Sequence, residues 1–274
     1  MKNISPNELD RIARTLSSRD WRILNFVSAQ KFATTTHLRR LCFTDHATIG
    51  AATRATLRVL DRLLERRLVG RLERRVGGGR RGSAGFIWHL DVAGERLTRP
   101  AGAPKRHVRE PSIAFLEHTL AVTDTVVALH ELAQDGGPAL TRFEVETAAW
   151  RRFLGPHGIP VILKPDLYAQ LSSDDYDDHW YLEVDRGTES LPVLLAKSHV
   201  YAAYRATQAA QAEHGVFPRV VWIVPTQRRV ARLEAAIHAD LGLPDRIFTC
   251  ITPEELPATL RAEASSPEQR KEEP

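Results

Sequence analysis

The chain has 274 residues, of which 43% are hydrophobic, and this is enough to build the cores of two globular domains. Its net charge of +4 conceals a division at Pro111. Residues 1–110 carry 23 Lys and Arg against 10 Asp and Glu, a net charge of +13, whereas residues 111–274 carry 15 against 24, a net charge of −9. A basic half of this kind indicates a polyanionic partner, and a solubilising surface explains it less well.

The two cysteines point to a reducing compartment, and the length of the hydrophobic runs bears on whether the chain crosses a membrane. Cys42 and Cys250 both lie in apolar segments and provide neither a disulfide framework nor a metal-binding pair. No run reaches the ~18–20 apolar residues of a membrane span, and the N-terminal segment lacks the apolar core of a signal peptide. We therefore expect a soluble, cytoplasmic protein.

The basic half predicts three helices. Apolar residues at helical spacing indicate a first helix around residues 19–31, a short second helix within 33–43 and a longer third helix that ends at Gly70. The expected core stripe of the third helix consists of Leu57, Leu60, Leu64 and Leu68. On the opposite face, three arginines recur every four residues, the geometry required of a helix in a major groove; they are Arg54, Arg58 and Arg62.

A β-hairpin is expected after these helices. Strands over residues 71–76 and 85–90 are joined by a turn rich in glycine and arginine, which predicts a wing. The arginines placed to contact phosphates there are Arg74, Arg75, Arg80 and Arg81. A disordered turn between two edge strands explains the tip equally well. Helices and hairpin together predict a winged helix-turn-helix DNA-binding domain over residues 1–98, followed by a basic linker over residues 99–111.

The acidic half predicts an α/β domain with a mixed sheet over residues 112–263 and a disordered tail over residues 264–274. The expected helices cover residues 112–133, 191–215 and 227–239, with a last helix after Pro253. The expected strands cover residues 141–150, 161–171, 179–189, 219–225 and 246–251.

Three acidic residues lie on two of these strands. Asp166 opens one strand, and Glu183 and Asp185 are two residues apart on the next, so their carboxylates share a face. Three converging carboxylates are suited to Mg²⁺ or Mn²⁺, which activates water for phosphodiester hydrolysis. A solvated strand face explains the same spacing, although the apolar neighbours of Glu183 favour a strand well inside the sheet.

The order of elements, with Pro165-Asp166 and Glu183-x-Asp185 on adjacent strands, resembles the PD-(D/E)xK nuclease fold. The segments PDLYAQL, YLEVDRGTES, AKSHVYAAY and EHTLAV, together with the N-terminal winged helix, resemble the replication-relaxation family over roughly residues 15–240. That family is associated with the replication and relaxation of plasmid DNA. The resemblance implies that Asp166 and Glu183 are the metal-binding acids of a restriction-endonuclease-like domain and that Glu117 supplies the acid of the first helix.

The sequence departs from the nuclease motif at Asp185. The motif has a lysine there, which orients the attacking water, and a carboxylate supplies no cation. Lys197 on the following helix is a candidate replacement, although an ordinary surface lysine is the favoured interpretation. His118 is a candidate donor to a scissile phosphate, against the more common role of a packing histidine.

Two hypotheses follow. In the first, the protein binds DNA during plasmid or mobile-element replication or relaxation and is a metal-dependent nickase or nuclease. In the second, the nuclease-like domain is degenerate, and the chain is a non-catalytic DNA-binding regulator of replication or transcription. Both predict double-stranded DNA as a partner, with replication proteins and a second copy of the chain as further candidates.

Overall fold

The chain forms two compact mixed α/β units, Met1–Val127 and Ala128–Pro274, in the computed structural model. The residues described by the structure are 4–72, 86–105, 111–155, 158–173, 176–244 and 246–264. The division falls inside helix α6 (Ile113–Gln134), beyond the linker that the sequence predicts. Leu116 and Leu120 of α6 are buried in one cluster with Phe32, which explains why the first half of this helix belongs to the first unit.

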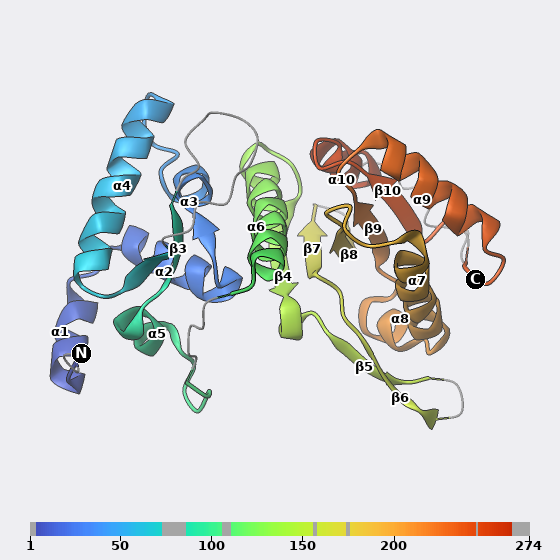
Figure 1. Cartoon of the computed structure of the whole chain (residues 1–274), viewed down its shortest axis with the longest axis horizontal. Helices are drawn as coiled ribbons and strands as arrows, with labels where there is room; N and C mark the ends of the chain where they lie inside the picture. The colour runs from blue at the N-terminus through green and yellow to red at the C-terminus, as the bar shows by residue number, and fades with distance from the viewer. Residues whose placement is uncertain are drawn as a thin grey trace. The chain divides into compact units, whose positions relative to one another are not determined.

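The first unit combines helices with a small sheet (Figure 1). Its other helices are α1 (Pro6–Arg14), α2 (Ser18–Gln30), α3 (Thr35–Cys42), α4 (Ile49–Glu65) and α5 (Val92–Thr98). Its strands are β1 (Ala33–Thr34), β2 (Val69–Leu72) and β3 (Ile87–Leu90). The strands pair antiparallel in the order β1-β3-β2.

Local signals explain where the helices of this unit begin. Ser17 and Thr34 each accept a hydrogen bond from a backbone N–H of the helix that follows and form a capping box. Thr48 caps α4 in the same way, by accepting from Ala51 N. These caps confirm the expected first, second and third helices to within a few residues at their starts.

The end of the third helix differs from the expectation. Helix α4 ends at Glu65, and Gly70, expected to stop it, lies inside strand β2. The chain reverses instead at Arg67, whose φ of 58° is in the left-handed region. Helix α1 was not predicted, although Ser5 caps it by accepting from Glu8 N and Pro6 follows at the first helical position.

The buried stripe of α4 is also different from the one expected. Its fully buried side chains are Ala52, Thr56, Leu60 and Leu63. Of the expected leucines, Leu60 and Leu68 are buried, although Leu68 lies beyond the helix, and Leu57 and Leu64 are half-buried. Alanine and threonine permit close packing of the helix. A prediction of the buried face that counts only large apolar residues does not include Ala52 and Thr56.

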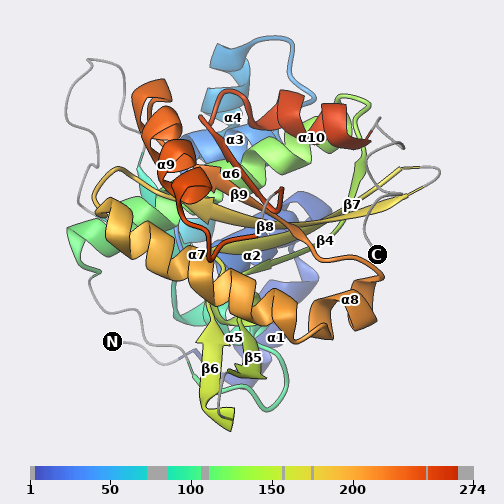
Figure 2. The same cartoon turned by 90° about the vertical axis from the view of Figure 1, so that its right-hand side faces the viewer.

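The second unit is built on a five-stranded mixed sheet (Figure 2). Its strands are β4 (Ala139–Val145), β5 (Arg151–Leu154), β6 (Pro160–Leu163), β7 (Leu167–Ser172), β8 (Asp177–Val184), β9 (Arg219–Ile223) and β10 (Phe248–Ile251). Its helices, besides the end of α6, are η1 (Glu146–Ala148), α7 (Leu191–Ala206), α8 (Ala209–His214), α9 (Gln227–Ala239) and α10 (Leu256–Ala264). The sheet order is β10-β9-β8-β7-β4, with β8, β9 and β10 parallel and β4 and β7 antiparallel to their neighbours.

Helices cover both faces of this sheet. Tyr181 of β8 packs with Tyr201 and Tyr204 of α7, and Trp222 of β9 packs with Leu233 of α9, so α7 and α9 cover one face. On strand β4, Phe143 alternates with Glu144 and contacts His130 of α6, which places the end of α6 on the other face. Strand β8 therefore lies inside the sheet and is covered on both sides.

Two expected elements are divided in the structure. The strand predicted over residues 161–171 is split into β6 and β7 at residues 164–166, and β6 pairs with β5 in a separate two-stranded hairpin. The helix predicted over residues 191–215 is split into α7 and α8 near Gln208, whose φ is 59°. Among the described residues, none of the helices has the length and apolar character needed to cross a membrane.

Candidate functional site

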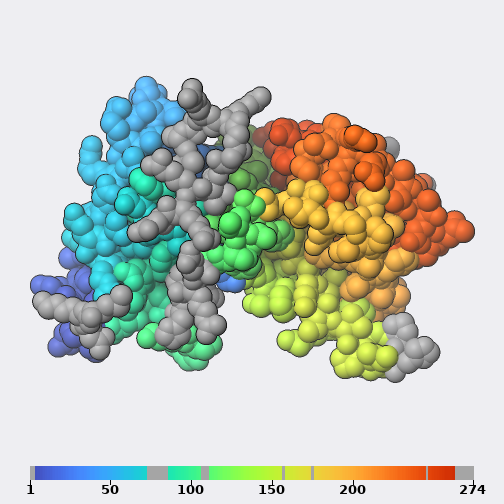
Figure 3. Space-filling view, in the orientation of Figure 1, coloured from blue at the N-terminus to red at the C-terminus, as the bar shows by residue number. Residues whose placement is uncertain are grey.

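Helix α4 forms part of the surface of the first unit (Figure 3). Two of the predicted DNA-binding arginines lie on this helix. Arg54 and Arg58 are exposed and lie one turn apart. They are on the side of the helix opposite Leu60 and Leu63, which are fully buried. Two guanidinium groups on one ridge are suited to contacts with successive phosphates or base edges.

Arg62, the third member of the predicted ridge, has a side chain that is 43% exposed, yet it is engaged by a carboxylate of the same unit. Its Nη2 lies 2.5 Å from Oδ1 of Asp20, whose side chain is 1% exposed. The other oxygen of Asp20 accepts from the backbone N–H of Ser17 at the start of α2. Arg62 therefore neutralises a buried carboxylate and joins α4 to α2. A contact of Arg62 with DNA stays a prediction, which competes with this ion pair.

The four predicted wing arginines, Arg74, Arg75, Arg80 and Arg81, lie outside the described residues. The strands that flank them, β2 and β3, pair antiparallel as expected, with Val69 opposite Leu90 and Leu72 opposite Ile87. The contribution of these arginines to DNA binding stays a prediction.

In the second unit, Glu183 of β8 lies at the centre of a buried polar cluster. Its side chain is 1% exposed. Lys197 Nζ donates to Glu183 Oε2 across 2.5 Å, and the hydroxyl of Tyr201 donates to Oε1, also across 2.5 Å. Both donors come from α7, one helical turn apart, so a single face of this helix binds both carboxylate oxygens.

The burial of this cluster alters the ionisation of its members. Burial raises the pKa of the Glu183 carboxyl to about 8, although Lys197 lowers it, and the nearby Asp166 raises it further. For Lys197, burial lowers the pKa, but the carboxylates of Glu183 and Asp166 raise it by more, so the ammonium group is held in its charged form. Burial raises the pKa of Tyr201 well above its usual value, so this phenol acts as a donor.

Asp166 lies immediately before β7 and faces the same cluster. Its Oδ2 accepts a hydrogen bond from the backbone N–H of Val184 at 2.8 Å, which ties the start of β7 to the end of β8. Its charge raises the pKa of Glu183, as expected for two carboxylates that share a site. The structure thus brings together Asp166, Glu183 and Lys197.

Asp185 has a different environment from Glu183. Its Oδ2 accepts from Arg229 Nε of α9, and its Oδ1 accepts from the backbone N–H of Gly187 at 2.9 Å. Arg229 also donates to the carbonyl of Glu189, so it fastens the loop after β8 to α9. The carboxylate of Asp185 is thus paired with a guanidinium, and its role as a third metal ligand stays a prediction.

The oxygens of these carboxylates are largely engaged by donors of the protein itself. Both oxygens of Glu183 and both oxygens of Asp185 already accept hydrogen bonds, and one oxygen of Asp166 does so too. Within the part of the chain that the structure describes, no group of three or more His, Cys, Asp or Glu residues is arranged to hold a metal. Mg²⁺ or Mn²⁺ stays a prediction of the sequence.

Two of the predicted catalytic residues lie in the first unit. Glu117 and His118 are on α6, before the division at Val127, whereas Asp166 and Glu183 belong to the second unit. Their participation in one site with the second-unit acids stays a prediction.

Tyr201 and Arg229 were not predicted as site residues, and Lys197 was expected at the surface. The ammonium of Lys197 instead binds a buried carboxylate, and its side chain is 29% exposed. A signal for Tyr201 was present, since it follows Lys197 by four residues on a predicted helix. No comparable signal existed for Arg229, because its pairing with Asp185 spans 44 residues.

Comparison with known proteins places this chain in a family. A search of curated proteins found no match, and neither did a search of solved structures. The model of the family described as Replication-relaxation matches residues 24–220, which include α4 and the acids Asp166, Glu183 and Asp185. Since this match covers more than half of the 274 residues, the chain belongs to the replication-relaxation family.

Proposed function

We propose that the protein binds double-stranded DNA through its first unit and acts in the replication or relaxation of plasmid or mobile-element DNA. The observation that carries this proposal is the pair of exposed arginines, Arg54 and Arg58, on one ridge of α4. A net charge of +13 over residues 1–110 supplies the field that attracts a polyanion.

The arrangement of the first unit supports a winged helix as its fold. Helices α2, α3 and α4 are followed by the antiparallel pair β2 and β3, and β1 between α2 and α3 completes the sheet. In this arrangement α4 is the recognition helix. Arg54 and Arg58 would then face the major groove.

The test is the salt dependence of duplex binding by the full chain. Each phosphate contact contributes about 0.9 to the slope of log affinity against log salt concentration. Replacing Arg54 and Arg58 with alanine should therefore weaken binding and reduce the slope by about 1.8 if both contact phosphates. Fluorescence anisotropy with a labelled duplex at several salt concentrations measures both quantities.

Helix α9 offers a matched control. Arg228 and Arg232 are also exposed and four residues apart, but they lie in the second unit. Their replacement by alanine changes the net charge equally and should leave the slope unchanged. If both double variants lose the same affinity, the effect is one of net charge, and the assignment of the DNA contact to α4 is wrong.

A metal-dependent nuclease is the second candidate function, and one contact favours it. The Nζ atom of Lys197 lies 2.5 Å from Glu183 Oε2, and the charge of Asp166 also acts on it. Lys197 therefore supplies, from α7, the cation that the nuclease motif has at the position of Asp185 and that this sequence lacks there. The second unit, with its mixed sheet covered by helices, is compatible with a restriction-endonuclease-like fold. Fold alone does not decide activity.

Nicking of supercoiled plasmid tests this candidate. Wild-type protein with Mg²⁺ or Mn²⁺ is compared with Lys197→Met and Asp166→Asn, and the product is followed on agarose gels. Conversion to the open circle that both substitutions abolish supports the nuclease. Wild-type protein that binds the plasmid but leaves it intact with either metal supports the non-catalytic alternative.

A further inference from the structure

A cavity of about 520 Å³ opens in the second unit, away from the Glu183 cluster. It lies between the sheet, at strands β4, β7 and β8, and helix α8. Its lining consists of Arg142, Gln170, Tyr176, Asp177, His179, Glu213 and His214. This volume falls within the range of about 300–1,000 Å³ that is typical of small-molecule sites.

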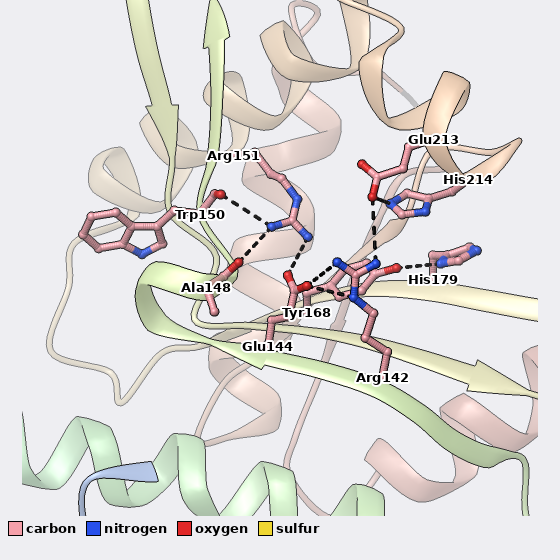
Figure 4. Close-up of polar contacts among 9 residues, drawn as sticks. All are labelled: Arg142, Glu144, Ala148, Trp150, Arg151, Tyr168, His179, Glu213 and His214. Carbon is pink, nitrogen blue, oxygen red and sulfur yellow. Dashed lines mark hydrogen bonds and ion pairs between the residues drawn. The ribbon is translucent and has the colours of Figure 1, made fainter. Parts of the chain in front are cut away.

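One wall of the cavity is aromatic (Figure 4). The imidazole rings of His179 and His214 stack with centroids 4.4 Å apart and planes inclined by 26°. Tyr168 stacks near them, at 6.2 Å from His179 and 5.6 Å from His214. The hydroxyl of Tyr168 is 2.7 Å from His179 Nδ1, which fixes the orientation of that ring. Flat rings held in this way form a surface on which another planar ring can stack.

An unsatisfied nitrogen marks the same wall. The side chain of His214 is 6% exposed, and its Nε2 is buried without a hydrogen-bond partner among the described residues. The nearest carboxylate oxygen, Glu213 Oε1, is 3.8 Å away, beyond hydrogen-bond distance. A buried polar atom without a partner costs free energy, so a ligand that hydrogen-bonds to His214 would be favoured.

The polar groups around the cavity include donors and acceptors. Arg142 is held in place by Glu144, which accepts from its Nε at 2.8 Å, and the guanidinium reaches within 3.9 Å of Glu213. Asp177 accepts from the hydroxyl of Ser172 at 2.5 Å. Gln170 lies opposite both Arg142 and His179 in the strand register and adds an amide.

The charge of this lining argues against an anion as the ligand. Two carboxylates, Asp177 and Glu213, face one guanidinium, that of Arg142. Burial lowers the pKa of both His179 and His214, which keeps the two rings uncharged near neutral pH. The net negative charge of the lining would repel a phosphate group. An uncharged ring that carries amino groups could instead donate hydrogen bonds to the two carboxylates.

We infer that this cavity binds an unstacked nucleobase that carries an exocyclic amino group, with the base stacked on the imidazole wall and the amino group donating to the carboxylates. The choice of a nucleobase rests on the proposed DNA-binding function. Proteins recognise single-stranded bases by stacking them on aromatic side chains and hydrogen-bonding their edges. A strand opened during replication or relaxation supplies such bases.

Binding of free deoxynucleosides to the full chain tests this inference, because nucleosides lack the phosphate that drives duplex binding. Calorimetric titrations use deoxyguanosine, deoxyadenosine, deoxycytidine, thymidine and inorganic phosphate. At least one amino-bearing nucleoside should bind, and thymidine, which has no exocyclic amino group, should bind about tenfold or more weakly than the best of them.

Substitutions locate the binding in the cavity. His179→Leu removes one stacking ring, and Asp177→Asn removes an acceptor at an exposed position where folding is not at risk. Each should weaken the tightest nucleoside by about tenfold. Asp178→Asn is the control, because side chains alternate along β8 and Asp178 is absent from the cavity lining.

Three results would overturn the inference: no nucleoside binds, thymidine or phosphate binds as tightly as the best nucleoside, or the cavity variants bind like wild type. Duplex binding is measured in parallel. Wild-type protein that binds a nucleoside but not the duplex would contradict only the proposed function, and wild-type protein that binds the duplex but no nucleoside would contradict only the inference about the cavity.

Discussion

Lys197 Nζ and Glu183 Oε2 form a 2.5 Å ion pair that joins helix α7 to the central strand β8. The carboxylate is almost completely buried, and its second oxygen is bound by Tyr201. Removing one partner of a buried pair leaves an uncompensated charge, which is more costly than the pair itself is stabilising. The pair therefore determines how the second unit responds to pH and to metal ions.

The first prediction concerns pH. The pKa of Glu183 is about 8 in the folded protein, above its ordinary value of 4.5, so the folded state binds more protons between these two values. The stability that this proton contributes is fully present below the ordinary pKa and is lost as pH rises through about 8. Glu183→Gln should therefore lose less stability than wild type between pH 5 and 8, as chemical denaturation at each pH will show. Parallel stability curves for the two proteins would contradict the raised pKa.

The second prediction concerns metal ions. Because Lys197 occupies one oxygen of Glu183, we expect the melting temperature of wild type to be insensitive to Mn²⁺ and Mg²⁺. Lys197→Met removes the cation beside the carboxyl groups of Glu183 and Asp166, and a divalent ion that displaces the proton of Glu183 should then raise the melting temperature. Metal at 100 times its dissociation constant would add about 2.7 kcal/mol. A rise in wild type that Glu183→Gln abolishes would instead support the metal site predicted from the sequence.

The third prediction concerns Asp185. Its side chain is 1% exposed and is paired with Arg229. Asp185→Ala should lower the free energy of unfolding by about 3–5 kcal/mol, the usual cost of breaking a buried pair. Asp185→Lys, which restores the residue of the nuclease motif, should be no less destabilising because it places two cations together. Urea denaturation measures both, and a stable Asp185→Lys variant would disprove the structural role of this carboxylate.

The fourth prediction separates the arginines of α4. Arg62→Met leaves the carboxylate of Asp20 buried without its cation and should lower the free energy of unfolding by about 1–3 kcal/mol. Arg58→Met, one turn earlier on the same ridge and exposed, should change it by less than about 0.5 kcal/mol. Equal effects on stability would mean that Arg62 is as free to contact DNA as Arg58.

Much of the first unit follows from local sequence. Ser17, Thr34 and Thr48 mark the starts of α2, α3 and α4, because a capping hydrogen bond joins residues only two or three positions apart. The end of helix α4 was less predictable from local sequence. Arg67 adopts a positive φ that its side chain does not favour, so only packing of the following strand decides where α4 ends.

In the second unit, the strand that carries Glu183 was predicted, whereas Asp166 lies in the break that divides another predicted strand, and the surroundings of both residues were not predicted. Alternation along β8 places Glu183 and Tyr181 on one face, as the sequence indicates. The pairing of Asp185 with Arg229 depends on how α9 crosses the sheet, and no local pattern encodes that contact.

The sequence by itself determined the division of charge between the two halves, most helices and strands, and the family to which the chain belongs, because these depend on composition, periodicity and short motifs. The tertiary structure alone decided which charged residues are available. It paired Arg62 with Asp20, Lys197 with Glu183 and Arg229 with Asp185. Burying a charge is costly unless an opposite charge lies beside it, and that partner comes from whichever element the fold brings near.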